Sequence, residues 1–266
     1  MPMALETHCF KIEYVESTVD TSVLWESHCH ARFEMIGVLE GDVSVMIEGA
    51  EYRLTENQAI LIPPLCYHTL NANRQERYRR ITVLFDGDAI PSPLTSHFSP
   101  HARTAVFSAS NLEQLKAVCN ADQAALYAPL ADALMVQSLY EWIEARKNAN
   151  EPASMDDLLQ TTVRYIDAHL RERLSVDDLA RLTSRSRSSF CHLFEERMGI
   201  PPKQYVLQKK MALANKLIRE GISPTDAASE LGYENYSSFY RMYVKQYGIM
   251  PKRTHPPREK KQKALS

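Results

Sequence analysis

The chain has 266 residues, of which 44% are hydrophobic and 24% are charged, which is typical of folded globular domains. It contains no apolar run of 18 residues, and its first ten residues lack the basic and apolar regions of a signal peptide, so we expect neither a membrane span nor secretion. Five scattered cysteines without a CxxC pair predict reduced thiols and a cytoplasmic location.

Charge is distributed unevenly along the chain. Residues 1–155 hold 11 Lys and Arg against 20 Asp and Glu, a net charge of −9. Residues 156–266 hold 20 Lys and Arg against 13 Asp and Glu, a net charge of +7. An acidic half joined to a basic half predicts that only the second half contacts a polyanion.

The first part of the chain is predicted to form short strands. Val43, Val45 and Ile47 alternate with polar or smaller residues, as half-buried strands do, and the same pattern recurs at residues 81–85. Turn signals at Gly-containing and Pro-Pro sites separate the strands. We therefore expect residues 1–107 to form an antiparallel β-barrel or jelly roll.

Helical spacing replaces alternation after residue 108. One stripe of small and apolar residues is formed by Ala131, Leu134, Met135, Ser138, Leu139 and Trp142, and it is widened by Val136, Tyr140 and Ile143. So wide an apolar surface predicts packing against two partners, of which one is the barrel. The other is a second subunit or the rest of the same chain. We expect residues 108–147 to be this helical segment and the polar residues 148–155 to be a linker.

The basic half contains an internal repeat. Ser189-Phe190 and Gly199 recur 49 residues later as Ser238-Phe239 and Gly248, and Leu179-Ala180 recurs 48 residues later as Ala227-Ala228. Each copy, within residues 156–255, predicts a helix, a tight turn and a second helix. The final residues, 256–266, are basic without apolar periodicity and are predicted to be disordered.

The ends of these helices are marked by capping residues. Ser175 with Asp178 predicts a capping box, and Ser223 before Pro224 predicts a second helix start. Gly232 occupies the turn of the second copy, where a positive φ is often required, and Ser184 occupies that place in the first. Gly199 and Gly248 are predicted to end the second helices. Residues 202–219 are predicted to form one helix that joins the two copies.

On these residues, the region 156–255 resembles the AraC-type DNA-binding domain, and residues 231–243 are similar to the family signature of its second helix-turn-helix unit. The resemblance implies an α+β protein of two domains, a cupin-like sensor and an all-α double helix-turn-helix. It implies a homodimeric transcription regulator that binds a double-stranded DNA operator, with a contact to RNA polymerase as a further expectation. Two recognition helices roughly 34 Å apart can enter successive major grooves.

The face of each second helix opposite its apolar residues is the expected DNA surface, and its alternative is a merely solvated face. The expected DNA-binding residues are Arg185, Arg187, Ser188, Cys191, His192, Asn235, Tyr236, Ser237, Tyr240 and Arg241. Arg suits guanine and Asn suits adenine. Additional phosphate contacts are expected from Lys209, Lys210, Lys245, Lys252 and Arg253.

The first half contains the spacing of the first cupin metal motif. His28, His30 and Glu34 follow that spacing, and His68 lies where the second motif places its histidine. Three imidazoles and a carboxylate suit a divalent transition metal. However, Asn57 and Leu65 replace the glycines of the second motif. Metal binding, a ligand pocket without metal, and purely structural histidines therefore remain open.

The resemblance also implies a small-molecule effector, such as a sugar or a related metabolite, bound inside the first domain. The expected ligand-binding residues are Trp25, His28, His30, Arg32, Glu34, Tyr52 and His68. The chain shows no nucleophile–base pair and no phosphate-binding loop, so we expect no catalytic residue and no required cofactor. The alternatives are a metal-dependent cupin enzyme with an appended DNA-binding domain, and a barrel that only dimerises.

Overall fold

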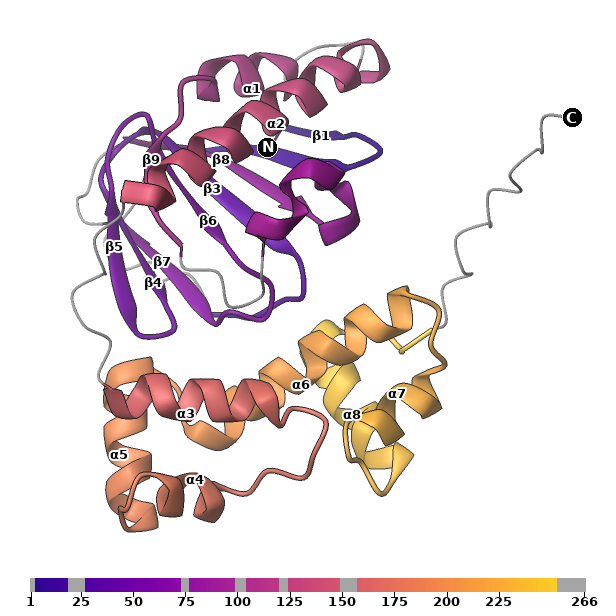
Figure 1. The fold of residues 1–266 in the computed structure, drawn as a ribbon. Helices are drawn as coiled ribbons and strands as arrows, with labels where there is room; N and C mark the ends of the chain where they lie inside the picture. The colour runs from indigo at the N-terminus through magenta and orange to yellow at the C-terminus, as the bar shows by residue number, and fades with distance from the viewer. Residues whose placement is uncertain are drawn as a thin grey trace, which may run out of the picture.

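The computed structural model describes residues 3–18, 27–72, 77–98, 104–119, 124–148 and 157–252. They form a strand-rich half with two covering helices and a separate, wholly helical half (Figure 1). This arrangement confirms the predicted α+β class with two domains. Trp25, almost all of the predicted linker and the predicted disordered tail lie outside the described residues.

The described strands form two antiparallel sheets rather than one closed barrel. The larger sheet has the order β1 (Met3–Glu6), β2 (Phe10–Thr18), β8 (Arg77–Phe85), β3 (Phe33–Glu40), β6 (Gln58–Ile62) and β9 (Val106–Ser108). The smaller sheet has the order β5 (Ala50–Leu54), β4 (Val43–Ile47) and β7 (His68–Ala72). Because each sheet buries one face against the other, apolar contact between the two faces holds the layers together without closure.

The larger sheet is buried on both faces. Along β3, Ile36 and Val38 belong to the core between the sheets, whereas Met35 and Leu39 belong to the core under the helices. Successive strand residues point to opposite faces, which explains why this strand is apolar almost throughout. The short 3-10 helices η1 (Gly87–Ala89) and η2 (Ser92–His97) pack on the face of the larger sheet that the helices cover.

Two helices, α1 (Leu112–Cys119) and α2 (Ala124–Asn148), cover the larger sheet. All six residues of the predicted stripe on α2 are at most 9% exposed. Tyr140, predicted to widen that stripe, is 50% exposed. Leu126 and Leu130, nearer the start of the same helix, are 67% and 48% exposed. Of the other two residues predicted to widen the stripe, Ile143 is buried and Val136 is half-buried, so only part of the second packing surface is uncovered in a single chain.

The helical half contains the predicted repeat. Its helices are α3 (Asp157–Ala168), α4 (Val176–Leu182), α5 (Arg187–Met198), α6 (Pro202–Arg219), α7 (Pro224–Glu230) and α8 (Tyr236–Tyr247). The pairs α4–α5 and α7–α8 are the two helix-turn-helix units, and α6 joins them (Figure 1). Among the helices of the described ranges, none combines the length and apolar character that crossing a bilayer demands.

The predicted helix ends are confirmed. Ser175 and Asp178 form a reciprocal capping box, and the Ser223 side chain caps α7, which begins at Pro224. Gly199 and Gly248 end α5 and α8 in the left-handed conformation. The turn residues Ser184 and Gly232 also have positive φ, 54° and 74° respectively. The two turns therefore share one backbone geometry although only the second has glycine.

Candidate DNA-binding and ligand-binding sites

The second helix of each unit presents one polar face to solvent. Phe190 and Phe194 anchor α5 in its core, and Phe239 and Tyr243 anchor α8. The predicted contacts that are exposed are Arg185, Arg187, Ser188, His192, Asn235, Tyr236, Ser237 and Arg241, whereas Cys191 and Tyr240 are half-buried. The structure thus brings the predicted residues onto two faces that a duplex can reach.

Asn235 has a structural role that the sequence did not indicate. It is the N-cap of α8, and its side-chain oxygen accepts a hydrogen bond from the Ser237 backbone N–H at 2.8 Å. Recognition of adenine by asparagine uses both the amide oxygen and the amide nitrogen. While Asn235 caps the helix, its amide oxygen has one lone pair already used, and its NH2 group is fully available to a base.

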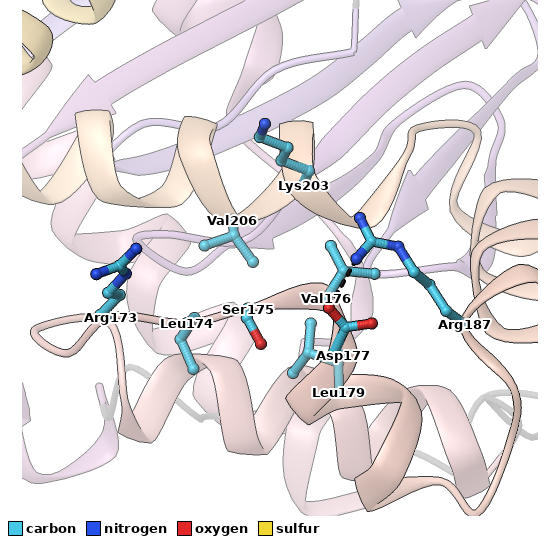
Figure 2. Close-up of a pocket in the computed structure, with 9 residues that line it drawn as sticks. All are labelled: Arg173, Leu174, Ser175, Val176, Asp177, Leu179, Arg187, Lys203 and Val206. Carbon is cyan, nitrogen blue, oxygen red and sulfur yellow. Dashed lines mark hydrogen bonds and ion pairs between the residues drawn. The ribbon is translucent and has the colours of Figure 1, made fainter.

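Arg187 lies at a surface pocket of the first unit (Figure 2). The pocket has a volume of about 320 Å³ and is lined by Arg173, Leu174, Ser175, Val176, Asp177, Leu179, Arg187, Lys203 and Val206. Within it, Arg187 donates to the Asp177 carboxylate at 2.7 Å. This bond uses only Nη1 of Arg187, so Asp177 orients the guanidinium and its other N–H groups stay available to DNA. The pocket is built entirely from the helical half, away from the histidines.

Two predicted phosphate contacts are wrong. Lys209 is 1% exposed, and its Nζ lies 2.9 Å from Glu48 and 2.6 Å from Asp167. Lys210 is 7% exposed and donates to the Leu231 backbone carbonyl at 2.8 Å. Both ammonium groups are therefore held inside the protein. Lys245 and Lys252 are exposed as predicted, and Arg253 lies outside the described residues.

The sequence signal for this burial was helical periodicity. Tyr205, Lys209 and Ala212 occur at i, i+4 and i+7 of α6 and lie on one buried stripe. Burial alone would lower the pKa of Lys209, but the carboxylates of Glu48 and Asp167 raise it well above its usual value. Lys209 therefore remains charged within its carboxylate pair.

In the strand half, four predicted residues converge. One ligand atom from each of His28, His30, Glu34 and His68 lies within 4.8 Å of the other three. Glu34 Oε2 is 2.8 Å from His30 Nε2 and 3.0 Å from His68 Nε2. Glu34 and His68 are buried, His30 is half-buried and His28 is exposed. The cluster is therefore accessible from solvent on the His28 side.

Hydrogen bonds orient two of the rings. His30 Nδ1 lies 3.1 Å from the Arg32 carbonyl oxygen, and His68 Nδ1 lies 2.9 Å from the Cys66 carbonyl oxygen. Burial alone would raise the pKa of Glu34, but hydrogen bonds from His30 and His68 hold it well below its usual range. Burial would likewise lower the pKa of His68, and the hydrogen bond and charge of Glu34 raise it instead.

The other predicted ligand residues are placed differently. Tyr52 is partly buried against the core between the sheets, on the interior side as expected. Arg32 lies at a bend that precedes β3, and its Nε approaches Asp86 at 3.9 Å rather than joining the histidines. The bend breaks the strand parity on which that prediction depended. Trp25 is outside the described residues.

A contact between the two halves was not predicted at all. Glu48, at the β4–β5 turn, accepts hydrogen bonds from the Tyr205 hydroxyl and from the Tyr67 backbone N–H, the latter at 2.9 Å. The Tyr67 and Tyr205 rings lie 5.7 Å apart. A Cβ on Gly49 would lie 3.1 Å from Met198 Sδ, so this turn approaches the helices closely. No local pattern pairs residues 157 positions apart in sequence.

Comparison with known proteins agrees with both halves. A family model described as an AraC-like ligand binding domain matches residues 10–141, and a helix-turn-helix domain model matches residues 179–255. The probable transcriptional regulator LumQ of Photobacterium leiognathi is 27% identical over 257 residues, 94% of this chain and 98% of the relative. The uncharacterized HTH-type transcriptional regulator YobQ of Bacillus subtilis is 24% identical over 86% of this chain and 88% of its own length.

Among solved structures, fatty-acid-bound ToxT from Vibrio cholerae superposes with a TM-score of 0.44 at 10% identity, covering 92% of this chain and 94% of that one. The fold and the family models define a DNA-binding transcription regulator with an N-terminal ligand-binding domain. Since the two models between them match more than three quarters of the sequence, the chain belongs to the AraC family of transcription regulators.

Proposed function

We propose that a small molecule bound between the two sheets controls how the two helix-turn-helix units engage an operator. The observation that supports this most strongly is the contact between the halves, where Glu48 of the strand half meets Tyr205 and Lys209 of the helix that joins the units. A ligand shifts DNA binding only if its affinity differs between two arrangements of this contact.

The DNA-binding part of the proposal is tested by selecting duplexes from a random pool with the full chain. We expect enrichment of paired subsites whose centres are about one helical turn apart, because α6 fixes the distance between the two units. Affinity for the selected duplex should fall steeply with salt, as phosphate contacts require. Recovery of no consensus would contradict sequence-specific recognition.

The proposed effector site is the end of the inter-sheet space beside His30, Glu34 and His68. Buried polar groups at the edge of an apolar core give a ligand site its specificity. A sugar or a related metabolite with several hydroxyl groups suits these donors and acceptors. A thermal-shift screen of such compounds should raise the melting temperature of the wild type and not of Glu34→Gln. Equal shifts in both proteins would place the effector elsewhere.

We propose no catalytic role for this cluster. The relatives carry the names of transcription regulators, which favours a regulator over the metal-dependent cupin enzyme that the histidine motif also allows.

The proposed dimer surface is the outer side of α2. Leu126, Leu130 and Tyr140 are exposed there, and a second copy would bury them. Sedimentation should show a dimer for the wild type and a monomer for the double variant Leu130→Glu, Tyr140→Glu. A contact with RNA polymerase remains a prediction, tested by transcription in vitro from a promoter that carries the selected site.

A further inference from the structure

Two short segments of the strand half pair with each other beside the histidine cluster. His28 and His68 form an antiparallel bridge, and each backbone N–H donates to the other residue's carbonyl at 3.0 Å. The Leu65 N–H also donates to the His30 carbonyl at 2.8 Å. We call residues 28–30 and 65–68 the histidine ribbon. Because bridged residues direct their side chains to the same face, His28 and His68 share one face of it.

The opposite face of the histidine ribbon lies in the contact between the two halves. Cys29 and Tyr67, which alternate with the histidines, are 4% and 6% exposed and belong to the core of the first helix-turn-helix unit. Cys66, which shares the parity of His68, packs against the core between the sheets. A displacement of the histidines would therefore move Cys29 and Tyr67 relative to the helices, because the residues are adjacent in the backbone.

The histidine face has the hydrogen bonding of a metal site. A neutral imidazole has one N–H, and for His30 and His68 the Nδ1 atom faces a carbonyl oxygen and must carry it. With both rings neutral, both Nε2 lone pairs then face Glu34 Oε2, and a cation among these atoms would relieve the repulsion. Backbone carbonyls that hold Nδ1–H are the usual support of histidines that ligate through Nε2. Protons on both rings would satisfy the same contacts, and metal titration separates these alternatives.

The two distances from Glu34 to the histidines are compatible with an ion as well as with hydrogen bonds. Ligands about 2.1 Å from a metal ion are about 3 Å apart at right angles and about 3.4 Å apart in the tetrahedral arrangement usual for zinc. The two separations from Glu34 Oε2 are 2.8 and 3.0 Å. The His28 ring, whose centroid is 4.4 Å from that of His68, supplies a third imidazole. Imidazole nitrogen with one carboxylate suits Zn²⁺, Ni²⁺ or Fe²⁺ better than Ca²⁺ or Mg²⁺.

On the face opposite the histidines, the histidine ribbon is bonded to a cluster of charged side chains. The Tyr67 N–H donates to Glu48, whose carboxylate also accepts from Tyr205 and lies 2.9 Å from Lys209 Nζ. Lys209 lies on α6, which contributes side chains to the cores of both helix-turn-helix units. Tyr67, the residue before His68, and its hydrogen bond to Glu48 thus connect the histidine cluster to the helix that spaces the recognition helices.

We propose that His28, His30, Glu34 and His68 bind one divalent transition-metal ion, and that the histidine ribbon transmits its occupancy to α6 through Tyr67 and Glu48. The inference deepens the proposed function and depends on it, since it assigns a ligand and a route to the same regulated contact. With metal bound, the ribbon is held in the position in which Glu48 meets Tyr205 and Lys209.

Metal binding is tested by calorimetric titration of Zn²⁺ into the full chain after treatment with a chelator. We expect one Zn²⁺ per chain, and an affinity at least about tenfold weaker in Glu34→Gln and in His68→Ala. His8→Ala is the matched control, because His8 is exposed and outside the cluster. Co²⁺ should give the visible absorption of a protein-bound ion in the wild type and in His8→Ala only. Absence of stoichiometric binding, or equal binding by Glu34→Gln, would overturn the site.

The connection from the histidine ribbon through Glu48 to α6 is tested without altering any of the four metal-binding residues. Tyr205→Phe removes the hydroxyl that Glu48 accepts, and by reciprocity of coupled equilibria it should weaken Zn²⁺ binding about fivefold. Tyr243→Phe is the control, since that buried tyrosine accepts a hydrogen bond from Asn215 in the second unit. Equal Zn²⁺ affinities for the two variants would overturn the route.

DNA binding with and without Zn²⁺ distinguishes a failure of the metal inference from a failure of the proposed function. Zn²⁺ should change the affinity of the wild type for the selected duplex about fivefold, and that of Glu34→Gln not at all. Specific DNA binding that is insensitive to Zn²⁺ would overturn this inference and leave the proposed function intact. Loss of specific binding with and without Zn²⁺ would overturn the proposed function itself.

Discussion

The two helix-turn-helix units have the same local structure and different surroundings. The core of the first unit includes Cys29 and Tyr67 of the strand half, whereas the core of the second contains residues of the helical half only. Outside these two cores, Arg219 at the end of α6 forms an ion pair with Asp86 of the strand half. If the proposed function holds, a signal from the ligand-binding domain would reach the first unit directly and the second through α6.

The largest expected loss of stability follows from breaking the buried ion pair that distinguishes the first unit. Lys209→Met leaves Glu48 and Asp167 buried without their cation, and we expect a loss of about 3–5 kcal/mol in the free energy of unfolding. Urea denaturation followed by circular dichroism measures it. Lys203→Met, on the exposed face of the same helix, should change stability by less than about 0.5 kcal/mol. Similar losses in both variants would contradict the role of the pair.

The next largest effect is expected in the affinity for DNA, where the two recognition helices should differ. Arg187 is held by Asp177, whereas the interaction of Arg241 is a 3.5 Å contact with the Ser238 hydroxyl. Arg241→Ala should therefore weaken binding to the selected duplex by about 1–3 kcal/mol, and Arg187→Ala by less. Fluorescence anisotropy with matched and randomised duplexes separates lost specificity from lost charge, with Lys245→Ala as the charge control. A larger loss for Arg187→Ala would reverse the ranking.

Substitutions at the glycine and the serine of the two turns should change the stability of the protein in opposite directions. Gly232 has a φ of 74°, and an added Cβ would lie 3.2 Å from the Glu172 carbonyl carbon, so Gly232→Ala should destabilise by about 1–2 kcal/mol. Ser184 has a φ of 54° without glycine, and Ser184→Gly should be neutral or stabilise by up to about 1 kcal/mol. Thermal unfolding measures both. A destabilised Ser184→Gly would show that its side chain makes a contribution larger than the strain.

The smallest effect concerns the Asn235 cap. Asn235→Ala should cost about 1 kcal/mol of stability, and Asn235→Ser, which keeps a capping oxygen, only a few tenths. If capping is its principal role, Asn235→Ser should also retain most of the affinity for the selected duplex. A stable Asn235→Ser protein with at least tenfold weaker DNA binding would instead show that the amide contacts a base.

The features predicted correctly are those determined by neighbouring residues. The capping box at Ser175, the proline start at Pro224 and the glycine ends at Gly199 and Gly248 depend on local backbone chemistry, and each is confirmed. The convergence of His28, His30 and Glu34 likewise followed from their spacing along the chain.

What the sequence could not give depends on contacts between distant residues. Lys209 was assigned to DNA because its charge is visible in the sequence, whereas its carboxylate partners lie 161 positions earlier and 42 positions earlier. Arg32 was assigned to the ligand by strand parity, which a bend ahead of β3 breaks. Glu48 attracted no prediction, because a glutamate in a turn is ordinarily solvated.

Helix α6 contributes side chains to both units at once. Tyr205 and Ala212 lie in the first core, and Met211, Ala214 and Leu217 in the second. Because both cores share this one helix, we expect the rotational phase between the recognition helices to stay constant. One base pair inserted between the two subsites turns one of them by about 35° relative to the other, and neither unit can follow. Natural operators for this protein should therefore vary in base sequence far more readily than in length.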